Sequence, residues 1–268
     1  MIHIVTALFC EAKPLIHHYR LNGQQAENGF RVYENDAMRL IIAGMGKCAA
    51  AAACAYLQGL APKKKHIWLN FGIAGHDSLL VGEAILAQKV IDAATNTAWY
   101  PPLLFTPPCR TVTLISVDQP ETGYVADVAC DMEASGFYAT AARFNSCELV
   151  QVFKVISDNR ASPVQQVSEK SAQEIISQQL DKLDAIIQQL RELEGRLAEQ
   201  QRKPAIDLFL QRWHFTVAQQ HMLQRLSQRW QVLTGTALDS NQFVAEKNSK
   251  AVLSAIENKI SVLPVRFD

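Results

Sequence analysis

Three acidic residues, Glu11, Glu133 and Asp158, stand at positions where an α/β chain places its chemistry. Glu11 follows a predicted buried strand over residues 2–8, Asp158 follows another over residues 149–156, and Glu133 opens a predicted helix. A carboxyl group can donate a proton, accept one or accept hydrogen bonds from hydroxyl groups. Each residue also has a purely structural interpretation. Glu133 could complement a helix N-terminus, Asp158 could cap a helix, and Glu11 could be a solvated loop charge.

The elements that would position these carboxylates alternate between strands and helices. The apolar patterns predict strands over 2–8, 30–35, 38–43, 66–71, 83–91, 111–117 and 149–156, and helices over 10–20, 48–60 and 132–144. This order indicates an α/β domain with a mostly parallel or mixed sheet. Ligands bind such sheets at the carboxyl ends of the strands, so the residues just past each strand are the candidates for a site.

The chain changes character after Pro163, where it becomes rich in glutamine and charge with apolar residues at helical spacing. This pattern predicts one long amphipathic helix over residues 164–200, which Pro204 ends. Two more amphipathic helices are predicted over residues 205–233 and 240–262. The C-terminal third is therefore predicted to be all helical.

We divide the chain into an α/β domain, residues 1–195, and a helical extension, residues 196–268. The extension has three interpretations: a subdomain that packs on the core or on a second subunit, a lid over a bound ligand, or a surface for a partner or nucleic acid. The last depends on cations near two tryptophans: Arg202, Lys203, Arg212, Arg225 and Arg229 near Trp213 and Trp230. The tryptophans fall on the apolar stripe, which favours a core position. His214 and His221 lack a third ligand nearby, which favours structure over metal binding.

Composition excludes several classes of protein. Of 268 residues, 49% are hydrophobic and 19% charged, and Lys+Arg and Asp+Glu are equal at 26 each. These values predict a folded chain with zero net charge, which argues against a nucleic-acid partner. The 6 cysteines form no CxxC pair, which favours free thiols in a reducing compartment. The N-terminus lacks a basic region and no apolar run is long enough for a bilayer. We therefore expect a cytoplasmic protein with no membrane partner, no metal and no cofactor.

Six short motifs occur in one order along residues 1–195. They are Ala7-Leu8-Phe9-Cys10-Glu11, Gly44-Met45-Gly46-Lys47-Cys48-Ala49-Ala50, Asn70-Phe71-Gly72-Ile73-Ala74-Gly75, Val81-Gly82-Glu83, Asp131-Met132-Glu133-Ala134 and Ile156-Ser157-Asp158. In order and spacing they resemble the purine nucleoside phosphorylase and nucleosidase superfamily, and they look most like its 5′-methylthioadenosine/S-adenosylhomocysteine nucleosidase branch. The resemblance implies a phosphorylase/hydrolase-like three-layer fold with a mixed central sheet. The helical extension has no counterpart in the compact members.

The resemblance also implies a role for each carboxylate in cleaving a purine N-ribosidic bond. Asp158 matches the family's general acid, which protonates nitrogen-7 of the leaving purine. Glu133 matches the acceptor for the 2′- and 3′-hydroxyls, and Glu11 matches the base that orients a water. The positions expected to contact substrate are those that match the family's pocket: Met132, which packs against the sugar, and Ala74, Gly75, Ile156 and Ser157.

The same comparison favours water over phosphate as the nucleophile. A phosphorylase must hold a phosphate dianion beside the sugar with cations and hydroxyls. In the bacterial hexameric phosphorylases that this family resembles, an arginine precedes the G-x-x-G turn and a serine lies inside it. Asn70 and Ile73 stand there in this chain, and neither binds an anion well. Lys13 and Lys47 are the remaining candidates, and Lys47 could equally be an exposed lysine at a helix start.

Several positions depart from the family pattern. Ile73 replaces a serine usual in the nucleosidases, and Lys154 replaces an arginine before Asp158. The segment between residues 117 and 131 is short, although relatives use this region to stack an aromatic ring on the base. Two aromatic residues are candidates for that role, Tyr124 and Phe105. The stretch from Trp99 to Pro102 could wall the pocket or a dimer interface, or could simply be a rigid packed loop.

Two hypotheses of different classes follow. The first is a nucleosidase that releases the base of a 5′-substituted adenosine or a related nucleoside, with a phosphate-dependent phosphorylase as its alternative. The second is a non-catalytic protein that binds a nucleoside and uses the helical extension to engage a partner. All three acidic positions are occupied, which favours the enzyme. The resemblance further implies a homodimer.

Overall fold

The computed structural model describes residues 1–24, 29–61, 66–120, 123–124, 127–200 and 206–264. The chain forms two compact units, Met1–Arg196 and Leu197–Asp268, and the boundary falls within the helix α5 (Leu180–Gln200). Among the helices of the described residues, none combines the length and the apolar character that a bilayer crossing requires.

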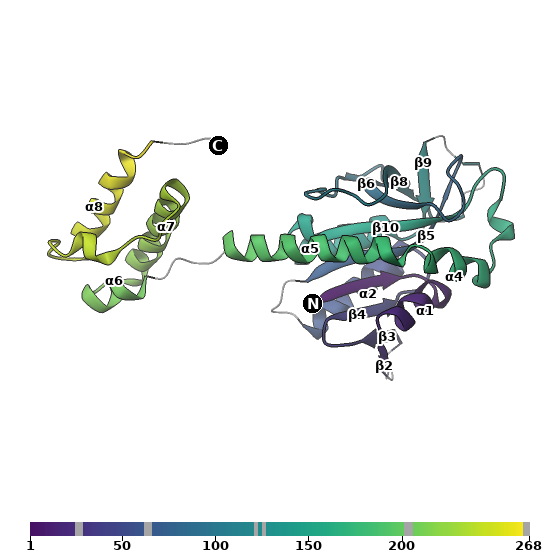
Figure 1. The fold of residues 1–268 in the computed structure, drawn as a ribbon, viewed down its shortest axis with the longest axis horizontal. Helices are drawn as coiled ribbons and strands as arrows, with labels where there is room; N and C mark the ends of the chain where they lie inside the picture. The colour runs from purple at the N-terminus through teal and green to yellow at the C-terminus, as the bar shows by residue number, and fades with distance from the viewer. Residues whose placement is uncertain (25–28, 62–65, 121–122, 125–126, 201–205, 265–268) are drawn as a thin grey trace. The chain divides into compact units, whose positions relative to one another are not determined.

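The first unit is built on one mixed sheet, in which the described residues form ten strands (Figure 1). These are β1 (Ile2–Thr6), β2 (Asn22–Gln24), β3 (Arg31–Glu34), β4 (Met38–Ile42), β5 (Ile67–His76), β6 (Ala84–Asp92), β7 (Ala98–Trp99), β8 (Arg110–Ser116), β9 (Val128–Asp131) and β10 (Val150–Asp158). The order is β10-β6-β8-β9-β5-β1-β4-β3-β2, with β7 on β6. Because β10 also pairs with β5, the strands β5, β10, β6, β8 and β9 close into a ring.

The central strands are buried on both faces, as their continuous apolar sequences predict. Every residue of β1 and of β10 is buried. Successive residues of β5 face opposite sides, so Trp68 joins the cluster formed with helices α2 (Lys47–Leu60) and α3 (Ala134–Phe144), whereas Phe71 stacks on Phe153 of β10. The helix α1 (Phe9–His18) packs against β1 and β4 and against α4 (Glu169–Ser177). The predicted α/β fold with a mixed central sheet is confirmed.

One strand is longer than its sequence predicts. The prediction ended the strand near residue 71 and placed a glycine turn at 72–75, but β5 continues to His76. Gly75 and His76 pair with Cys130 and Ala129 of β9, a strand that sequence analysis did not predict. Glycine in a strand often marks the close approach of another group, and this is the case here.

The single helix predicted over residues 164–200 is wrong. The segment contains a 3-10 turn, η2 (Val164–Gln166), followed by α4 and α5 as separate helices. The Ser168 side chain accepts a hydrogen bond from the Ser171 N–H and so begins α4. The chain turns between α4 and α5 while Ile176, Leu180 and Leu183 stay buried, and the apolar period therefore hides the break. Pro204, the predicted end of the helix, lies outside the described residues.

The second unit has a core of its own. It contains α6 (Asp207–Arg212), α7 (Val217–Thr234), the 3-10 turn η3 (Ser240–Phe243) and α8 (Ser249–Ser261). The predicted helices over 205–233 and 240–262 are each interrupted, because Thr216 and Asn248 cap new helices with their side chains. Trp213 and Trp230 pack against this core, as their place on the apolar stripe predicts. Arg202 and Lys203 lie outside the described residues.

Candidate active site

A cavity of about 190 Å³ opens at the carboxyl ends of β1, β5, β9 and β10 in the first unit. Its lining brings together most of the predicted site residues: Glu11, Ala74, Gly75, Met132, Glu133, Ser157 and Asp158. The other described lining residues are Ala7, Leu8, Met45, Ile73, Val117, Pro120, Cys130, Asp131 and Val164. Ile156, also predicted to contact substrate, instead lies in the hydrophobic core with no exposed surface.

Glu11 is held by the backbone in the first turn of α1, and it is only 3% exposed. Its Oε2 accepts hydrogen bonds from the N–H groups of Ala7 at 2.9 Å and Leu8 at 2.8 Å. Its Oε1 accepts one from the Ile73 N–H at 3.0 Å. A Cβ at Gly72 would lie 2.6 Å from the same Oε1, so glycine is needed for the carboxylate to reach β5. The solvated-loop interpretation of Glu11 is therefore wrong.

Asp158 lies at the end of β10, where two hydroxyl groups bind its carboxylate. The Ser157 hydroxyl donates to Oδ1 at 2.5 Å, and the Tyr124 hydroxyl donates to Oδ2 at 2.8 Å. A Cβ at Gly75 would lie 2.7 Å from Oδ2, so this glycine, like Gly72, is needed because a carboxylate presses against β5. The two glycines of the G-x-x-G sequence thus each accommodate one of the predicted catalytic carboxylates.

Glu133 occupies the position before α3 but makes no side-chain cap to that helix. Its Oε1 instead accepts a hydrogen bond at 2.8 Å from the N–H of Gly46, which lies between β4 and α2. The helix is capped by Asp131, whose Oδ2 accepts from the Ala134 N–H at 2.9 Å. The helix-complement role therefore belongs to Asp131, and Glu133 lines the cavity beside Met132.

A buried lysine supplies the positive charge behind these carboxylates. Lys154 of β10 is 2% exposed, and its Nζ lies 2.8 Å from Asp131 Oδ2 and 4.0 Å from Glu133 Oε2. Burial and then the neighbouring Asp131 raise the pKa of Glu133 to about 7, although Lys154 opposes the rise. Burial also raises the pKa of Glu11, and Lys154 and the three backbone N–H groups oppose that rise.

The cations considered for phosphate do not line the cavity. Lys47 starts the helix α2, but its side chain is only 16% exposed and binds Asp92 and Asp118, so it is not the exposed helix-start lysine of one interpretation. Lys13 is exposed on α1 and does not line the cavity. Asn70 is buried in β5 and donates to the Val5 carbonyl at 3.1 Å. Among the described residues that line the cavity there is no lysine and no arginine.

The aromatic candidates take different places. Tyr124 is buried, but its hydroxyl binds Asp158. Neither Phe105 nor Trp99 lines the cavity, and Trp99 packs against the core from β7. The Tyr124–Asp158 and Lys154–Asp131 contacts were not predicted, because each joins segments that only the closed sheet brings together. The sequence did carry one signal, an isolated lysine in a mostly apolar strand.

Several solved structures share this fold. The 5′-methylthioadenosine/S-adenosylhomocysteine nucleosidase of S. pneumoniae is 18% identical over 68% of this chain and 96% of its own, with a TM-score of 0.51. The Arabidopsis thaliana 5′-methylthioadenosine nucleosidase is 14% identical over 70% and 95%, with a TM-score of 0.60. The futalosine hydrolase of Helicobacter pylori is 18% identical over 69% and 97%, with a TM-score of 0.52. The chain therefore has the nucleoside phosphorylase and nucleosidase fold. No family model and no curated protein matches the sequence.

Proposed function

We propose that this chain is a nucleosidase that hydrolyses the N-glycosidic bond of a purine nucleoside. One observation carries the proposal: Glu11, Glu133 and Asp158 surround a single cavity, and no cation is among its described lining residues. Burying three carboxylates around one space costs free energy, and such clusters of buried ionisable groups are typical of functional sites. The shared fold of the nucleosidases above supports the same activity.

In the proposed reaction each carboxylate acts at a different part of the substrate. Asp158 donates its proton to nitrogen-7 of the purine, so that the base leaves as a neutral molecule when the bond from C1′ to nitrogen-9 breaks. Glu133 accepts hydrogen bonds from the ribose hydroxyls and stabilises the positive charge that develops on the sugar. Glu11 accepts a proton from the water whose oxygen bonds to C1′. The products are the free base and the free sugar.

Water is the nucleophile in this proposal because nothing on the described cavity wall neutralises a phosphate dianion. Lys154, buried behind the wall, is paired with Asp131, and Lys47 is paired with Asp92 and Asp118. An anion needs a cation or a set of donors that are not already occupied. The Ile73 N–H, which lies in the G-x-x-G sequence of β5, already donates to Glu11.

For the substrate we propose a 5′-substituted adenosine or a related purine nucleoside. The support is the chemistry named for the structural neighbours, which act on 5′-methylthioadenosine, S-adenosylhomocysteine or futalosine. The lining is apolar apart from the carboxylates and Ser157, which suits a base and a hydrophobic substituent. We further propose a homodimer in the cytoplasm, and gel filtration with light scattering would measure the former.

The experiment that tests the proposal is base release from a panel of nucleosides. Methylthioadenosine, adenosylhomocysteine, adenosine, inosine, deoxyadenosine and futalosine are each incubated with and without phosphate. Release without phosphate is expected. The Asp158→Asn variant should lose turnover by at least about 100-fold, since general acid catalysis contributes that much or more. Asp181→Asn, on the exposed side of α5, is the matched control.

Strict dependence on phosphate would replace the hydrolase with a phosphorylase. Full activity of a folded Asp158→Asn variant would remove Asp158 from the mechanism. Tight nucleoside binding without release from any member of the panel would favour the non-catalytic binding protein.

A further inference from the structure

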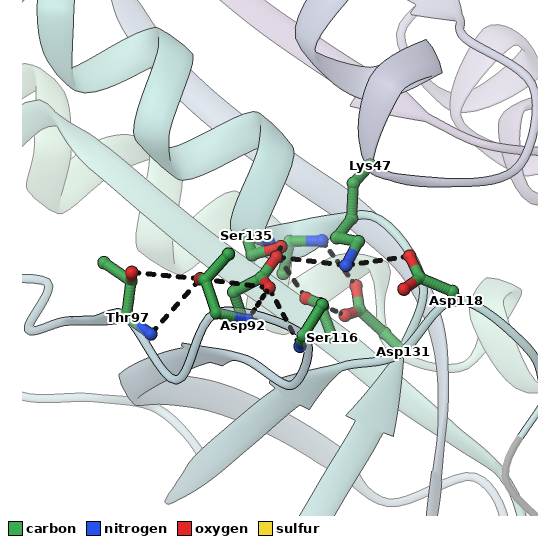
Figure 2. Close-up of polar contacts among 10 residues, drawn as sticks. Lys47, Asp92, Thr97, Ser116, Asp118, Asp131 and Ser135 are labelled. Atoms are coloured by element: carbon green, nitrogen blue, oxygen red, sulfur yellow. Dashed lines mark hydrogen bonds and ion pairs between the residues drawn. The ribbon is translucent and has the colours of Figure 1, made fainter.

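Lys47, the first residue of α2, binds two carboxylates that lie at or just past the ends of different strands (Figure 2). Its Nζ lies 3.1 Å from Asp92 Oδ2, at the end of β6, and 2.8 Å from Asp118 Oδ1, just past β8. The Lys47 side chain is 16% exposed, and those of Asp92 and Asp118 are 12% and 66% exposed. A partly buried lysine held between two carboxylates loses much of its side-chain freedom.

The Asp92 end of this pairing is firmly anchored. The Asp92 carboxylate also accepts hydrogen bonds from the Thr95 N–H at 2.9 Å and from the Ser135 hydroxyl at 2.9 Å. Burial disfavours the charge, but Thr95, Ser135 and Lys47 outweigh it and lower the pKa of Asp92 to about 2. Asp92 therefore stays ionised at every pH at which the enzyme would work. Figure 2 shows this carboxylate in the middle of the polar cluster.

The cluster continues from Asp92 to the wall of the active site. The Ser135 N–H donates to the Ser116 hydroxyl at 2.9 Å, and Ser116 donates to Asp131 Oδ1 at 2.6 Å. Asp131 in turn binds Lys154 behind the cavity. The ends of β6, β8 and β9 and the starts of α2 and α3 are thus joined by one set of hydrogen bonds and ion pairs.

Lys47 also sits next to a residue that touches Glu133. The Gly46 N–H donates to Glu133 Oε1 at 2.8 Å, and Gly46 has a φ of 99°, a left-handed conformation that glycine adopts without strain. The first turn of α2 presses against α3 so closely that a Cβ at Gly136 would lie 2.1 Å from the Lys47 carbonyl oxygen. The direction of the Gly46 N–H therefore depends on where Lys47 is held.

We propose that Lys47 is a positioning residue for Glu133. By binding Asp92 and Asp118 it fixes the Met45–Gly46 segment, so that the Gly46 amide holds the Glu133 carboxylate toward the ribose site. The Asp118 contact also ties this segment to residues 117–120, from which Val117 and Pro120 line the same cavity as Met45. The effect of Lys47 on catalysis rests on the proposed nucleosidase function, whereas its effect on the positions of Gly46 and Glu133 does not.

The charged groups around Glu133 predict how loss of the Lys47 contacts would change the pH dependence of the reaction. The groups that face Glu133 are Lys154 of β10, Asp131 of β9, Glu11 of α1 and the Gly46 amide. Replacing Lys47 with methionine releases the segment and weakens the hydrogen bond from the Gly46 N–H, which stabilises the ionised Glu133 carboxylate more than the neutral acid. The acid limb of kcat/KM in Lys47→Met should therefore move to higher pH by about half to one unit.

An NMR measurement tests the coupling without relying on activity. Met45-Gly46 is the only Met–Gly pair in the sequence, so labelling methionine carbonyls with ¹³C and glycine amides with ¹⁵N selects the Gly46 amide. In the wild-type protein this signal should shift with pH as Glu133 titrates, and its exchange with solvent should be slow. In Lys47→Met the pH-dependent shift should shrink and exchange should speed up by at least about tenfold.

The control variant is Lys170→Met, which removes an exposed lysine paired with Glu174 on α4. It should leave the Gly46 signal and the pH profile as in the wild type, while Lys47→Arg should restore both in part. Asp118→Asn removes the exposed partner alone, so its Gly46 exchange rate and its acid limb should lie between those of the wild type and Lys47→Met. It serves as the second variant if Lys47→Met unfolds.

An unchanged Gly46 signal and acid limb in folded Lys47→Met and Asp118→Asn would overturn the proposal and leave Lys47 a scaffold residue. If the wild type released no base from any nucleoside, the proposed function would fail. The Gly46 signal would still decide whether Lys47 positions Glu133.

Discussion

The hydroxyl of Tyr124 donates a hydrogen bond to Asp158 Oδ2 at 2.8 Å, and the same hydroxyl accepts one from the Val164 N–H at 3.2 Å. Tyr124 adopts a φ of 44°, which is costly for a residue with a side chain, so surrounding contacts hold it in place. One such contact is the Arg160 side chain, which donates to the Tyr124 carbonyl at 2.8 Å. The proposed general acid, Asp158, is therefore hydrogen-bonded and held in place by Tyr124, a residue that sequence analysis considered only for stacking on the base.

Replacing Tyr124 with phenylalanine should lower the rate of the reaction. The hydroxyl group holds Asp158 Oδ2 at 2.8 Å, and a proton donor that loses its position transfers its proton less well. Without this hydrogen bond, kcat/KM should fall by about tenfold, which corresponds to about 1.4 kcal/mol. Steady-state kinetics measures this, and Tyr33→Phe in β3, which does not line the cavity, is the control. An unchanged kcat/KM for a folded Tyr124→Phe would rule out the role.

Adding a methyl group at Gly72 or Gly75 should remove activity without unfolding the protein. The new Cβ would lie 2.6 Å from Glu11 at position 72, or 2.7 Å from Asp158 at position 75, so the carboxylate must move. A displacement of about 1 Å can lower kcat by about 100-fold. Gly59→Ala is the matched control, because nothing lies within 4 Å of its Cβ and alanine favours the helix α2. Steady-state kinetics and thermal unfolding separate the two effects, and a fully active Gly72→Ala would contradict the site geometry.

The pKa of Glu133, raised to about 7 mainly by burial, makes a prediction for the wild-type enzyme. Glu133 must be ionised to accept the ribose hydroxyls, so kcat/KM should fall about tenfold per pH unit below that value. Lys154→Met removes the cation that favours the ionised form and should move this limb upward. It should also lower the free energy of unfolding by about 3–5 kcal/mol, because buried carboxylates lose their partner. Chemical denaturation and a pH-rate profile measure both, and an unmoved acid limb would exclude Glu133 as its source.

The sequence predicted the parts of this site that depend on local pattern. Apolar runs located β1, β5 and β10, and the rule that ligands bind at strand ends then selected Glu11 and Asp158. The long-range contacts within the chain could not be predicted, because hydrogen bonds such as the one from Gly46 to Glu133 join segments far apart in sequence. The glycine turn expected at 72–75 failed for a related reason: those glycines accommodate carboxylates within a continuing strand. Helix breaks were missed where a capping side chain interrupts an unbroken apolar period.

A buried histidine should make the protein acid-sensitive. His3 of β1 is fully buried, stacks on His66 at 4.1 Å between ring centroids and has no partner for either ring nitrogen among the described residues. Burial, with His66, Arg39 and the N-terminus, lowers its pKa from 6.5 to about 2. Below pH 6.5 the unfolded chain therefore binds a proton at His3 that the folded chain does not bind. The free energy of unfolding falls as the pH drops below 6.5.

The measurement is the free energy of unfolding in urea between pH 7 and pH 4. His3→Phe should flatten its pH dependence by up to about 1.4 kcal/mol per pH unit, the most that one proton can contribute. His17→Phe removes an exposed imidazole from α1 and controls for the loss of a histidine as such. An equally steep slope in His3→Phe would assign the acid sensitivity to other groups.

We propose that the α/β domain alone carries the activity. All the described residues that line the cavity fall between Ala7 and Val164, and the core of the second unit is formed by residues from Ile206 to Ile260. A chain ending at Arg196, the last residue of the first unit, should therefore fold and release base with kcat/KM within about threefold of the full chain. Loss of activity in a truncated protein with an unchanged thermal transition would show instead that the helical extension covers the substrate. Loss of folding would show that the α/β domain depends on residues beyond Arg196.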